Sequence, residues 1–496
     1  MTVLGARGGE PDPTDQGTAD ALAASALGRP KRRVLMFLYF FPPLGGVSMS
    51  RNVRNVQHLP RYGWLPTIVT PRDPGYGIRD PGALALIPEE APVLRTRSIE
   101  AGHVRAFLAP LVRRLRAHLK PSRPVVGHRR GAVGADGRFS SRSGAAASGP
   151  AVEDAPLGLE RLRRLMFFPD DRVGWLPFAV ARAVAVHRAG PFDAVFSTSS
   201  PVTSHLAAGL VKRLTGVPWV AEFRDPWVGN VLAAPLPWAY RRLQVKLERW
   251  IVGSADVVVC VTPSLSRLYR DRYPGAHVVT ITNGYDRTES PGRPARVRTE
   301  TYEIVYTGTL DRAAEFEVFL EGVDSLVARR PDLAARLRLT FYGEVAESCR
   351  AIAARLVRDG HLGAVVRFAG FVPRRDALAA VRAADAALVL LGSGPGMELF
   401  VGGKLYDYLG QDAQILAMLP DGDARDVLDG LGWGITVRPD RNDVGRAVER
   451  LLDVPPPTGP ADPSRRYDRE RLAGLLAAAL DDARERSVAS SRNRQP

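Results

Sequence analysis

The chain alternates short apolar runs with stretches in which apolar residues recur at helical spacing. This alternation is typical of parallel β-sheets covered by helices on both faces. In the first half, strands are predicted at residues 34–41, 64–70, 193–198, 217–223, 256–261 and 278–282. In the second half, they are predicted at residues 303–307, 337–342, 365–369, 386–391, 414–418 and 434–437. We therefore predict an α/β protein with two Rossmann-like, doubly wound parallel-sheet domains.

A length of 496 residues is too great for one hydrophobic core and fits two domains with extensions. A Pro- and Arg-rich segment at 287–299 is the predicted linker. We place the first domain at 31–290, the second at 300–455, and a C-terminal helix that packs back on either domain at 465–486. Residues 1–30 and 487–496 are predicted to be disordered, because they offer little to bury.

The net charge of +15 is unevenly distributed. Residues 101–165 hold 13 Lys and Arg against 4 Asp and Glu, so +9 of the excess lies in this predicted insertion, placed at about 101–160. Residues 103–119 form a basic amphipathic pattern that favours an anionic membrane surface, although a solvated helix explains it equally well. Residues 121–156 are Gly-, Ala-, Ser- and Arg-rich and are predicted to be a disordered loop.

The cysteines and the hydropathy limit the setting of the protein. Cys260 and Cys349 are far apart and belong to no CxxC or Cys/His cluster, so we expect a reducing compartment and no metal site. No apolar run reaches about 18 residues, and the first 30 residues lack the order of a secretion signal. We expect a cytoplasmic protein, with attachment to the inner face of the plasma membrane through the basic insertion as a hypothesis.

The most informative segment is residues 402–410, which places two glycines, a cation and a carboxylate at the start of one helix. Gly402 and Gly403 leave the backbone bare where a helix offers unpaired N–H groups, which favours a phosphate. Lys404, one of only five lysines, adds a positive charge, and Asp407 lies on the same helix face, where it can accept hydrogen bonds from sugar hydroxyls. This arrangement fits a nucleotide-sugar, whereas an ordinary amphipathic helix is the alternative.

Six segments together resemble the glycosyltransferase family 4-like group. They are residues 38–70, 197–227 (which contains EFRDPW), 281–286 (ITNGYD), 304–310 (IVYTGTL), 367–372 (RFAGFV) and 402–410 (GGKLYDYLG). The resemblance spans residues 32 to about 450 without the insertion. It implies the GT-B fold of two facing Rossmann-like domains, and transfer of a sugar from a nucleotide-diphosphate donor, usually with retention and without a required metal. It also implies that the donor binds the second domain and the acceptor the first.

In the second domain, the resemblance assigns donor contacts to the ends of strands. Gly308 and Thr309 are expected to contact the sugar-phosphate side of the donor, and Arg312 is the one nearby cation where the family often has an Arg and a Lys. Phe371 and Val372 match the place where the family holds the base, although core packing explains Phe371 equally well.

The family often carries two glutamates eight residues apart near this donor helix. This chain has Glu398 and Asp407, nine apart, so Asp407 takes the ribose role and Glu398 is the weaker match for the residue near the transferred sugar.

In the first domain, two segments are candidates for binding and catalysis. Gly45 and Gly46 follow the first strand and would let the donor phosphates or the acceptor approach the backbone, although a plain tight turn also explains them. Asp225 is a candidate to orient or deprotonate the acceptor hydroxyl, and Arg224 to hold a phosphate of a lipid-linked acceptor; a structural Arg–Asp pair is the alternative. His205 is a further candidate, with a structural histidine as the alternative.

We therefore predict a glycosyltransferase that moves a sugar to a cell-surface polysaccharide or lipid-linked acceptor, without a cofactor or a metal. Lys404 and the helix start would stabilise the leaving diphosphate. The alternatives are a sugar-nucleotide epimerase on the same fold and a non-catalytic basic protein that binds anionic lipid or nucleic acid. We expect no nucleic-acid partner for the enzyme itself, because most of the charge excess lies in the insertion and the rest of the chain is close to balanced for its size.

Overall fold

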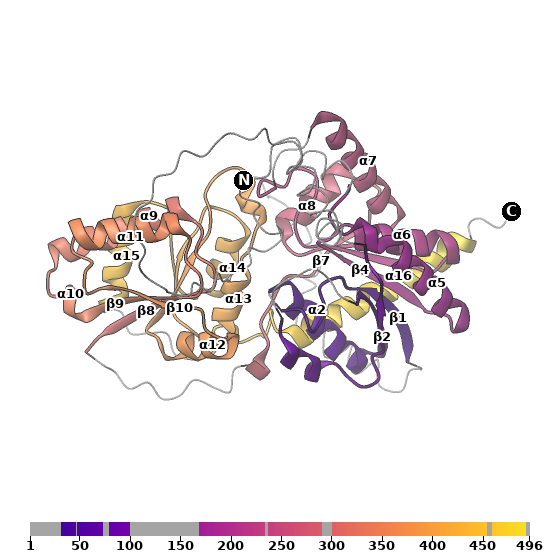
Figure 1. Cartoon of the computed structure of the whole chain (residues 1–496), viewed down its shortest axis with the longest axis horizontal. Coiled ribbons are helices and arrows are strands. Elements are labelled where there is room, and N and C mark those ends of the chain that lie inside the picture. The colour runs from indigo at the N-terminus through magenta and orange to yellow at the C-terminus, as the bar shows by residue number, and fades with distance from the viewer. Residues whose placement is uncertain are drawn as a thin grey trace, which may run out of the picture.

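The computed structural model describes residues 31–45, 47–72, 79–99, 168–233, 237–289, 300–453 and 459–492. Gly46, the predicted N-terminal extension, the basic insertion with its amphipathic pattern, and the end of the predicted linker lie outside these ranges. In the described part, the chain forms two parallel sheets in two domains that lie side by side (Figure 1).

The first sheet has seven strands in the order β3-β2-β1-β4-β5-β6-β7, all parallel. Its strands are β1 (Arg32–Phe37), β2 (Trp64–Pro71), β3 (Val93–Thr96), β4 (Ala194–Ser199), β5 (Trp219–Phe223), β6 (Val257–Cys260) and β7 (Val278–Thr280). The predicted strands are all present within a few residues. β1 ends at Phe37, earlier than residue 41. β3 was not predicted, because four residues at a sheet edge give too short a pattern.

Helices cover both faces of the first sheet, because alternate strand residues point to opposite sides. Val34 and Met36 join the cluster under α2 (Val47–His58), whereas Leu35 and Phe37 pack on the other face. The helices of that second face are α5 (Leu176–Ala189), α6 (Thr203–Thr215), α7 (Trp238–Ser254) and α8 (Pro263–Arg272).

The second sheet has six strands in the order β10-β9-β8-β11-β12-β13, also all parallel. The strands are β8 (Tyr302–Thr307), β9 (Leu337–Tyr342), β10 (Val366–Gly370), β11 (Ala386–Leu390), β12 (Ile415–Met418) and β13 (Ile435–Val437). All six coincide with predicted strands within a residue or two.

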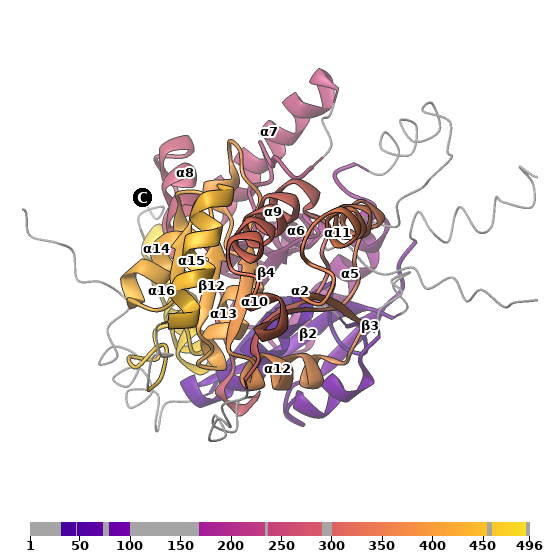
Figure 2. The same cartoon turned by 90° about the vertical axis from the view of Figure 1, so that its left-hand side faces the viewer.

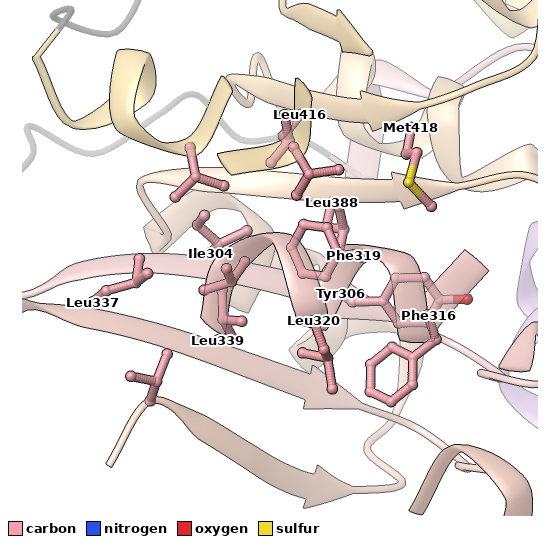
Figure 3. Packing of buried hydrophobic residues seen from close by; sticks show 14 of the residues in the cluster. Ile304, Tyr306, Phe316, Phe319, Leu320, Leu337, Leu339, Leu388, Leu416 and Met418 are labelled. Atoms are coloured by element: carbon pink, nitrogen blue, oxygen red, sulfur yellow. The ribbon is translucent and has the colours of Figure 1, made fainter. Parts of the chain in front are cut away.

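Two helical layers enclose this second sheet. One face packs on α9 (Ala313–Arg329), α11 (Glu347–Asp359) and α15 (Arg441–Asp453), with the short α10 (Leu333–Arg336) beside them; Figure 2 shows this layer with the second domain in front. Figure 3 shows Phe316, Phe319 and Leu320 of α9 packed against strand side chains. The other face carries α12 (Arg374–Ala383), α13 (Gly403–Gly410) and α14 (Asp423–Leu431).

The last helix, α16 (Arg469–Arg492), returns to the first domain (Figure 1). Leu472, Leu476 and Leu480 pack with α2 in the core of the first sheet. The helix extends past the predicted end at residue 486, so residues 487–492, predicted as part of a disordered tail, are helical. The low apolar content of this last stretch gave no signal for a helix that continues from a packed one. Within the described ranges, no helix is long and apolar enough to cross a membrane.

Candidate donor and acceptor site

Lys404 belongs to the first turn of α13, and its side chain reaches the carboxyl end of β8. This is the edge at which an open parallel sheet is expected to bind a ligand. Lys404 Nζ donates to the Tyr306 hydroxyl and, at 3.1 Å, to the carbonyl oxygen of Thr309, and lies 3.9 Å from the centre of the Tyr306 ring. A Cβ at Gly308 would lie 2.8 Å from Lys404 Cε, and Gly308 has a φ of +96°. Glycine at 308 is therefore favoured by its backbone conformation, and it leaves room for the end of the Lys404 side chain.

The environment of Lys404 disfavours its charge. Burial lowers the pKa of Lys404 to about 7; Asp311 opposes this shift and Arg312 adds to it. An amine with such a pKa is half protonated near neutral pH, and an anion placed beside it would favour the charged form. Perturbed pKa values of this kind concentrate at functional sites.

Arg312 joins the same cluster from the loop after β8. Its Nη1 lies against the backbone of Gly392, just past the end of β11, since a Cβ there would approach the guanidinium to 2.6 Å. Arg312 also acts on the pKa of Lys404, so the two cations share one environment. The structure thus brings together Gly308, Thr309, Arg312 and Lys404, all predicted as donor residues.

Helix α13 begins beside these cations with an open N-terminus. Gly402 is the N-cap residue, no side chain caps the helix start, and a Cβ at Gly402 would meet nothing within 4 Å. The φ of Gly402 is −63°, so any residue could adopt this conformation. The glycine therefore leaves free space in front of the helix rather than permitting a strained turn.

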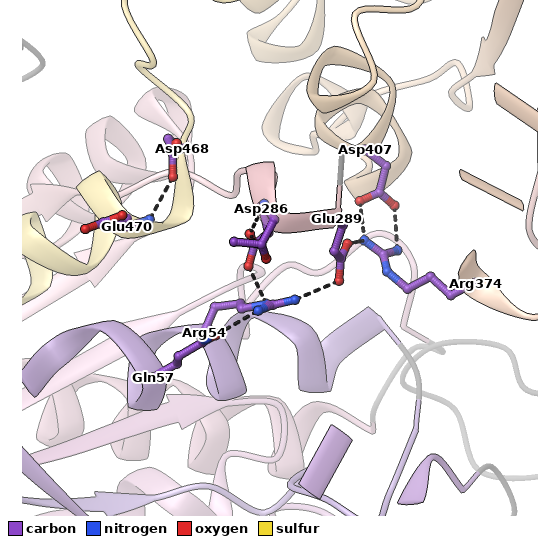
Figure 4. Close-up of polar contacts among 9 residues, drawn as sticks. Arg54, Gln57, Asp286, Glu289, Arg374, Asp407, Asp468 and Glu470 are labelled. Atoms are coloured by element: carbon purple, nitrogen blue, oxygen red, sulfur yellow. Dashed lines mark hydrogen bonds and ion pairs between the residues drawn. The ribbon is translucent and has the colours of Figure 1, made fainter. Parts of the chain in front are cut away.

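Asp407, three residues beyond Lys404, is held by an arginine that the sequence reasoning did not name. Arg374, the first residue of α12, donates from Nη1 to Asp407 Oδ2 at 2.9 Å and from Nη2 to Oδ1 at 2.8 Å (Figure 4). Nη2 also donates to Glu289 Oε2 at 2.9 Å. Only the spatial packing of α12 against α13 could reveal this contact.

Phe371 stands in solvent directly after β10. Its exposed fraction is 78%, which excludes the alternative of core packing. Val372 follows it, half-buried, and precedes α12. An exposed aromatic ring at the carboxyl end of a parallel strand is available to stack on a base.

Glu398 lies in a short turn, η5 (Met397–Leu399), that meets the first domain. Its Oε2 accepts a hydrogen bond from the backbone N of Gly396 at 2.8 Å, so the carboxylate closes its own turn. The Thr262 hydroxyl of the first domain donates to the Leu399 carbonyl oxygen at 3.1 Å. The loop before α13 therefore touches the first domain, and Figure 1 shows α13 and α14 on the side of the second domain that faces the first.

The motif at the end of β5 contains both buried and partly exposed charges. Glu222 is fully buried; its Oε1 accepts from Arg51 Nε at 3.0 Å and Nη2 at 2.6 Å, and its Oε2 from the Thr198 hydroxyl at 2.8 Å. Burial alone would raise the pKa of Glu222, but the Arg51 guanidinium holds it below the usual value. The costly buried carboxylate is thus paired through α2.

Arg224 and Asp225 have shifted pKa values. Burial lowers the pKa of Arg224, and it raises the pKa of Asp225 despite the opposing charge of Arg224. A carboxylate with a raised pKa is a stronger base, which suits the predicted role of Asp225. The next segment is fixed by α7, where buried Glu248 accepts from the backbone N of Val228 at 2.8 Å.

Arg469, at the start of α16, is a second cation that the sequence reasoning missed. It is 8% exposed, and among the described residues its Nη1 has no hydrogen-bond partner. Burial lowers its pKa to about 9, and Arg51 and Arg224 add to this shift. Only the return of α16 to the first domain brings residue 469 near residue 224.

The remaining first-domain candidates have different outcomes. His205 is fully buried, its Nδ1 lies 2.8 Å from the Ser197 hydroxyl, and its ring lies 4.6 Å from that of Phe223. Burial lowers its pKa to about 3, which favours the structural alternative for His205. Gly45 is buried in the loop after β1, whereas Gly46 lies outside the described residues.

Comparison with known proteins agrees with this architecture. Residues 141–289, in the first domain, match the family model described as Glycosyltransferase Family 4. A search of curated protein sequences gives no significant match.

Several solved structures share the fold over nearly the whole chain. Sucrose-phosphate synthase from Thermosynechococcus elongatus is 15% identical with a TM-score of 0.52, over 92% of this chain and 94% of that one. The α,α-trehalose 6-phosphate synthase from Burkholderia multivorans is 14% identical with a TM-score of 0.52, over 94% and 97%. A glycosyltransferase from Rickettsia africae is 10% identical with a TM-score of 0.52, over 94% and 100%. At these identities the likeness shows the fold alone.

The predicted GT-B fold and the resemblance to the glycosyltransferase family 4-like group are thus confirmed. Fold and family match together make this chain similar to glycosyltransferases of the GT-B fold. The region of the Glycosyltransferase Family 4 type lies in its first domain.

Proposed function

We propose that this glycosyltransferase binds a nucleotide-diphosphate sugar on its second domain and transfers the sugar, with retention, to an acceptor on its first domain. The observation that carries the proposal is the convergence of Lys404 and Arg312 on the carboxyl ends of β8 and β11, beside the open start of α13. Two cations and a free helix N-terminus form a site suited to a diphosphate.

The rest of the donor fits around this diphosphate site. Phe371 and Val372 would hold the base, because the exposed ring offers a stacking surface. Asp407 would accept hydrogen bonds from the ribose hydroxyls. Glu398 is a weaker candidate for a sugar contact, since its carboxylate is already engaged by Gly396.

In the transfer, the bond between the anomeric carbon and the diphosphate oxygen breaks, and the acceptor oxygen forms the new bond to that carbon. Negative charge develops on the leaving diphosphate, where Lys404, Arg312 and the start of α13 would stabilise it. Asp225 would orient the acceptor hydroxyl or take its proton, and its raised pKa favours that role.

The cations near Asp225 support an anionic acceptor. Arg224 lies beside Asp225 in the chain, and buried Arg469 shares its electrostatic environment. A phosphate on a lipid-linked saccharide would compensate these charges. We propose such an acceptor, or a growing cell-surface polysaccharide, met at the inner face of the plasma membrane.

We propose that the transfer needs no metal ion. Within the ranges that the structure describes, no group of three or more His, Cys, Asp or Glu is placed to hold one. Independence from metal remains a prediction, which activity in the presence of EDTA would test.

A thermal-shift screen of UDP-, GDP- and ADP-sugars tests the donor site, because a ligand that binds only the folded state raises the melting temperature. We expect one nucleotide-sugar to stabilise the wild type, and this shift to be lost in Lys404→Met. The control is Lys246→Met, which removes an exposed lysine of α7. Stabilisation that survives in Lys404→Met would contradict the diphosphate assignment.

A further inference from the structure

Arg374 connects the two parts of the donor site and the first domain. It is the first residue of α12, three residues after exposed Phe371. Its guanidinium donates two hydrogen bonds, of 2.9 and 2.8 Å, to the carboxylate of Asp407 in α13. Its Nη2 also reaches Glu289, 2.9 Å away, at the end of the first-domain turn η4 (Arg287–Glu289). Figure 4 shows the guanidinium between these two carboxylates.

The first-domain end of this contact is fixed by buried charges. Glu289 Oε1 accepts from Arg54 Nη2 at 3.0 Å, and Arg54 Nε lies 2.6 Å from Asp286 Oδ2. Arg54 and Asp286 are only 4% and 6% exposed in their side chains, and Asp286 Oδ1 accepts from the backbone N of Thr288 at 2.7 Å. The buried Arg54 therefore holds the Glu289 carboxylate at the position where it contacts Arg374.

The contact between Arg374 and Asp407 is more than a typical surface ion pair. Exposed ion pairs contribute little to stability, but a bidentate pair fixes the orientation of the carboxylate. Burial would lower the pKa of Arg374, yet Asp407 and Glu289 raise it above the usual value, so the guanidinium remains charged. In this chain of contacts, Arg54 and Arg374 pair with Asp286, Glu289 and Asp407. The three carboxylates outnumber the two arginines, so the cluster keeps a net negative charge that favours a further hydrogen-bond donor.

A carboxylate has about four lone-pair sites, and Arg374 occupies one on each oxygen of Asp407. The outer site of each oxygen remains for a hydrogen-bond donor, and these two sites point away from each other, on opposite edges of the carboxylate. Each outer site can accept from one hydroxyl, so a ribose hydroxyl can bind one oxygen of Asp407 while Arg374 holds the carboxylate in place. A fixed carboxylate also loses less rotational freedom when the ligand binds.

We propose that Arg374 is a positioning residue that orients Asp407 toward the ribose of the donor, and that Glu289 anchors this arginine to the first domain. The inference rests on the proposed nucleotide-sugar site. It adds that the ribose contact depends on a residue of α12 and, through Glu289 and Arg54, on α2 of the first domain.

The test compares UDP, GDP and ADP with their 2′,3′-dideoxy counterparts by calorimetry. We expect wild-type protein to prefer the ribose form of the nucleotide that binds. Arg374→Lys keeps the positive charge but loses the two parallel N–H donors of the guanidinium. It should therefore weaken the affinity for the ribose form about tenfold and leave the affinity for the dideoxy form unchanged. Glu289→Gln should give a smaller loss of about threefold, again only for the ribose form.

A double-mutant cycle separates positioning from a structural effect. If Arg374 acts through Asp407, then Arg374→Lys combined with Asp407→Asn should cost no more than Asp407→Asn alone. The matched control is Glu317→Gln, which breaks an exposed second-domain ion pair with Arg355 at 2.5 Å and should change neither affinity.

Three results would overturn the inference, and they are distinguishable. Equal losses for the ribose and dideoxy forms would show that Arg374 only supports the local structure. Unchanged affinities in Arg374→Lys would show that Asp407 needs no orientation. Failure of wild-type protein to bind any of the three nucleoside diphosphates would remove the donor site itself, and this inference with it.

Discussion

The low pKa of Lys404 makes donor binding depend on pH. A pKa of about 7 leaves roughly 90% of the free lysine protonated at pH 6 but only about 1% at pH 9. If the diphosphate binds the charged form, the apparent dissociation constant rises in inverse proportion to that fraction. We therefore expect affinity to fall roughly 90-fold from pH 6 to pH 9.

Calorimetry with an intact nucleotide-sugar measures this dependence, because its diphosphate stays fully ionised across the range. His205, with a pKa of about 3, does not titrate there. Lys404→Arg is the decisive control: arginine stays charged at every pH, so its binding curve should be flat. Equal wild-type affinities at pH 6 and pH 9 would refute the assignment of the diphosphate to Lys404.

The same pKa fixes the sign of an effect on stability without ligand. The folded-state pKa of Lys404 lies below the ordinary 10.5, so the unfolded chain binds more protons between pH 7 and pH 10.5. Lys404 therefore makes the free energy of unfolding increase as the pH rises through this window. Between pH 7 and pH 9 the contribution is about 2 kcal/mol, and Lys404→Met should remove it in chemical denaturation.

Three further predictions follow from other residues. Phe371→Ala should weaken nucleotide binding roughly tenfold in calorimetry, since base stacking on an aromatic ring contributes about 1–3 kcal/mol, without lowering the melting temperature of the protein. Asp423→Ala should lower the free energy of unfolding by about 1–3 kcal/mol, because Asp423 of α14 accepts from Ser264 N at 3.0 Å and Oγ at 2.9 Å across the domain contact. His205→Asn should reduce acid sensitivity in denaturation, because a folded pKa of about 3 makes stability fall as the pH drops below 6.5, by roughly 2 kcal/mol at pH 5.

Each of these predictions has a matched control. Trp238→Ala removes an aromatic ring of similar exposure, 71%, from the first domain and should leave nucleotide binding intact. Asp421→Ala removes an exposed acid just before α14 and should not change stability. If Phe371→Ala binds nucleotide as tightly as the wild type, the stacking role of Phe371 is wrong. If Asp423→Ala has the same free energy of unfolding as the wild type, the contact between Asp423 and Ser264 does not stabilise the protein. If the stability of His205→Asn depends on acid pH as that of the wild type does, the buried neutral state of His205 is contradicted.

Much of the fold could be predicted from the sequence, because it depends on local patterns. Twelve of the strands were predicted from apolar runs, since a strand buried on both faces has a continuous apolar sequence. The missed strand β3 has only four residues, VLRT, and lies at the edge of the sheet. Its charged Arg95 breaks the apolar pattern that identified the other strands.

Part of the candidate site was also local. Gly402, Gly403, Lys404 and Asp407 share one short segment, so a helix start with a cation and a carboxylate could be predicted. The sequence could not choose between base stacking and core packing for Phe371, because both use an apolar aromatic ring. Its exposed position in the structure rules out core packing, and base stacking stays a prediction.

The sequence by itself thus determined the order of strands and helices and the chemistry of the segment around Lys404, because both are set by neighbours in the chain. Only the tertiary structure decided which distant charges meet. Arg374 and Glu289 are 85 positions apart, Arg51 and Glu222 are 171 apart, and Arg469 reaches the first domain only because α16 packs there. Contacts at such separations depend on how helices pack on sheets, which no local pattern encodes.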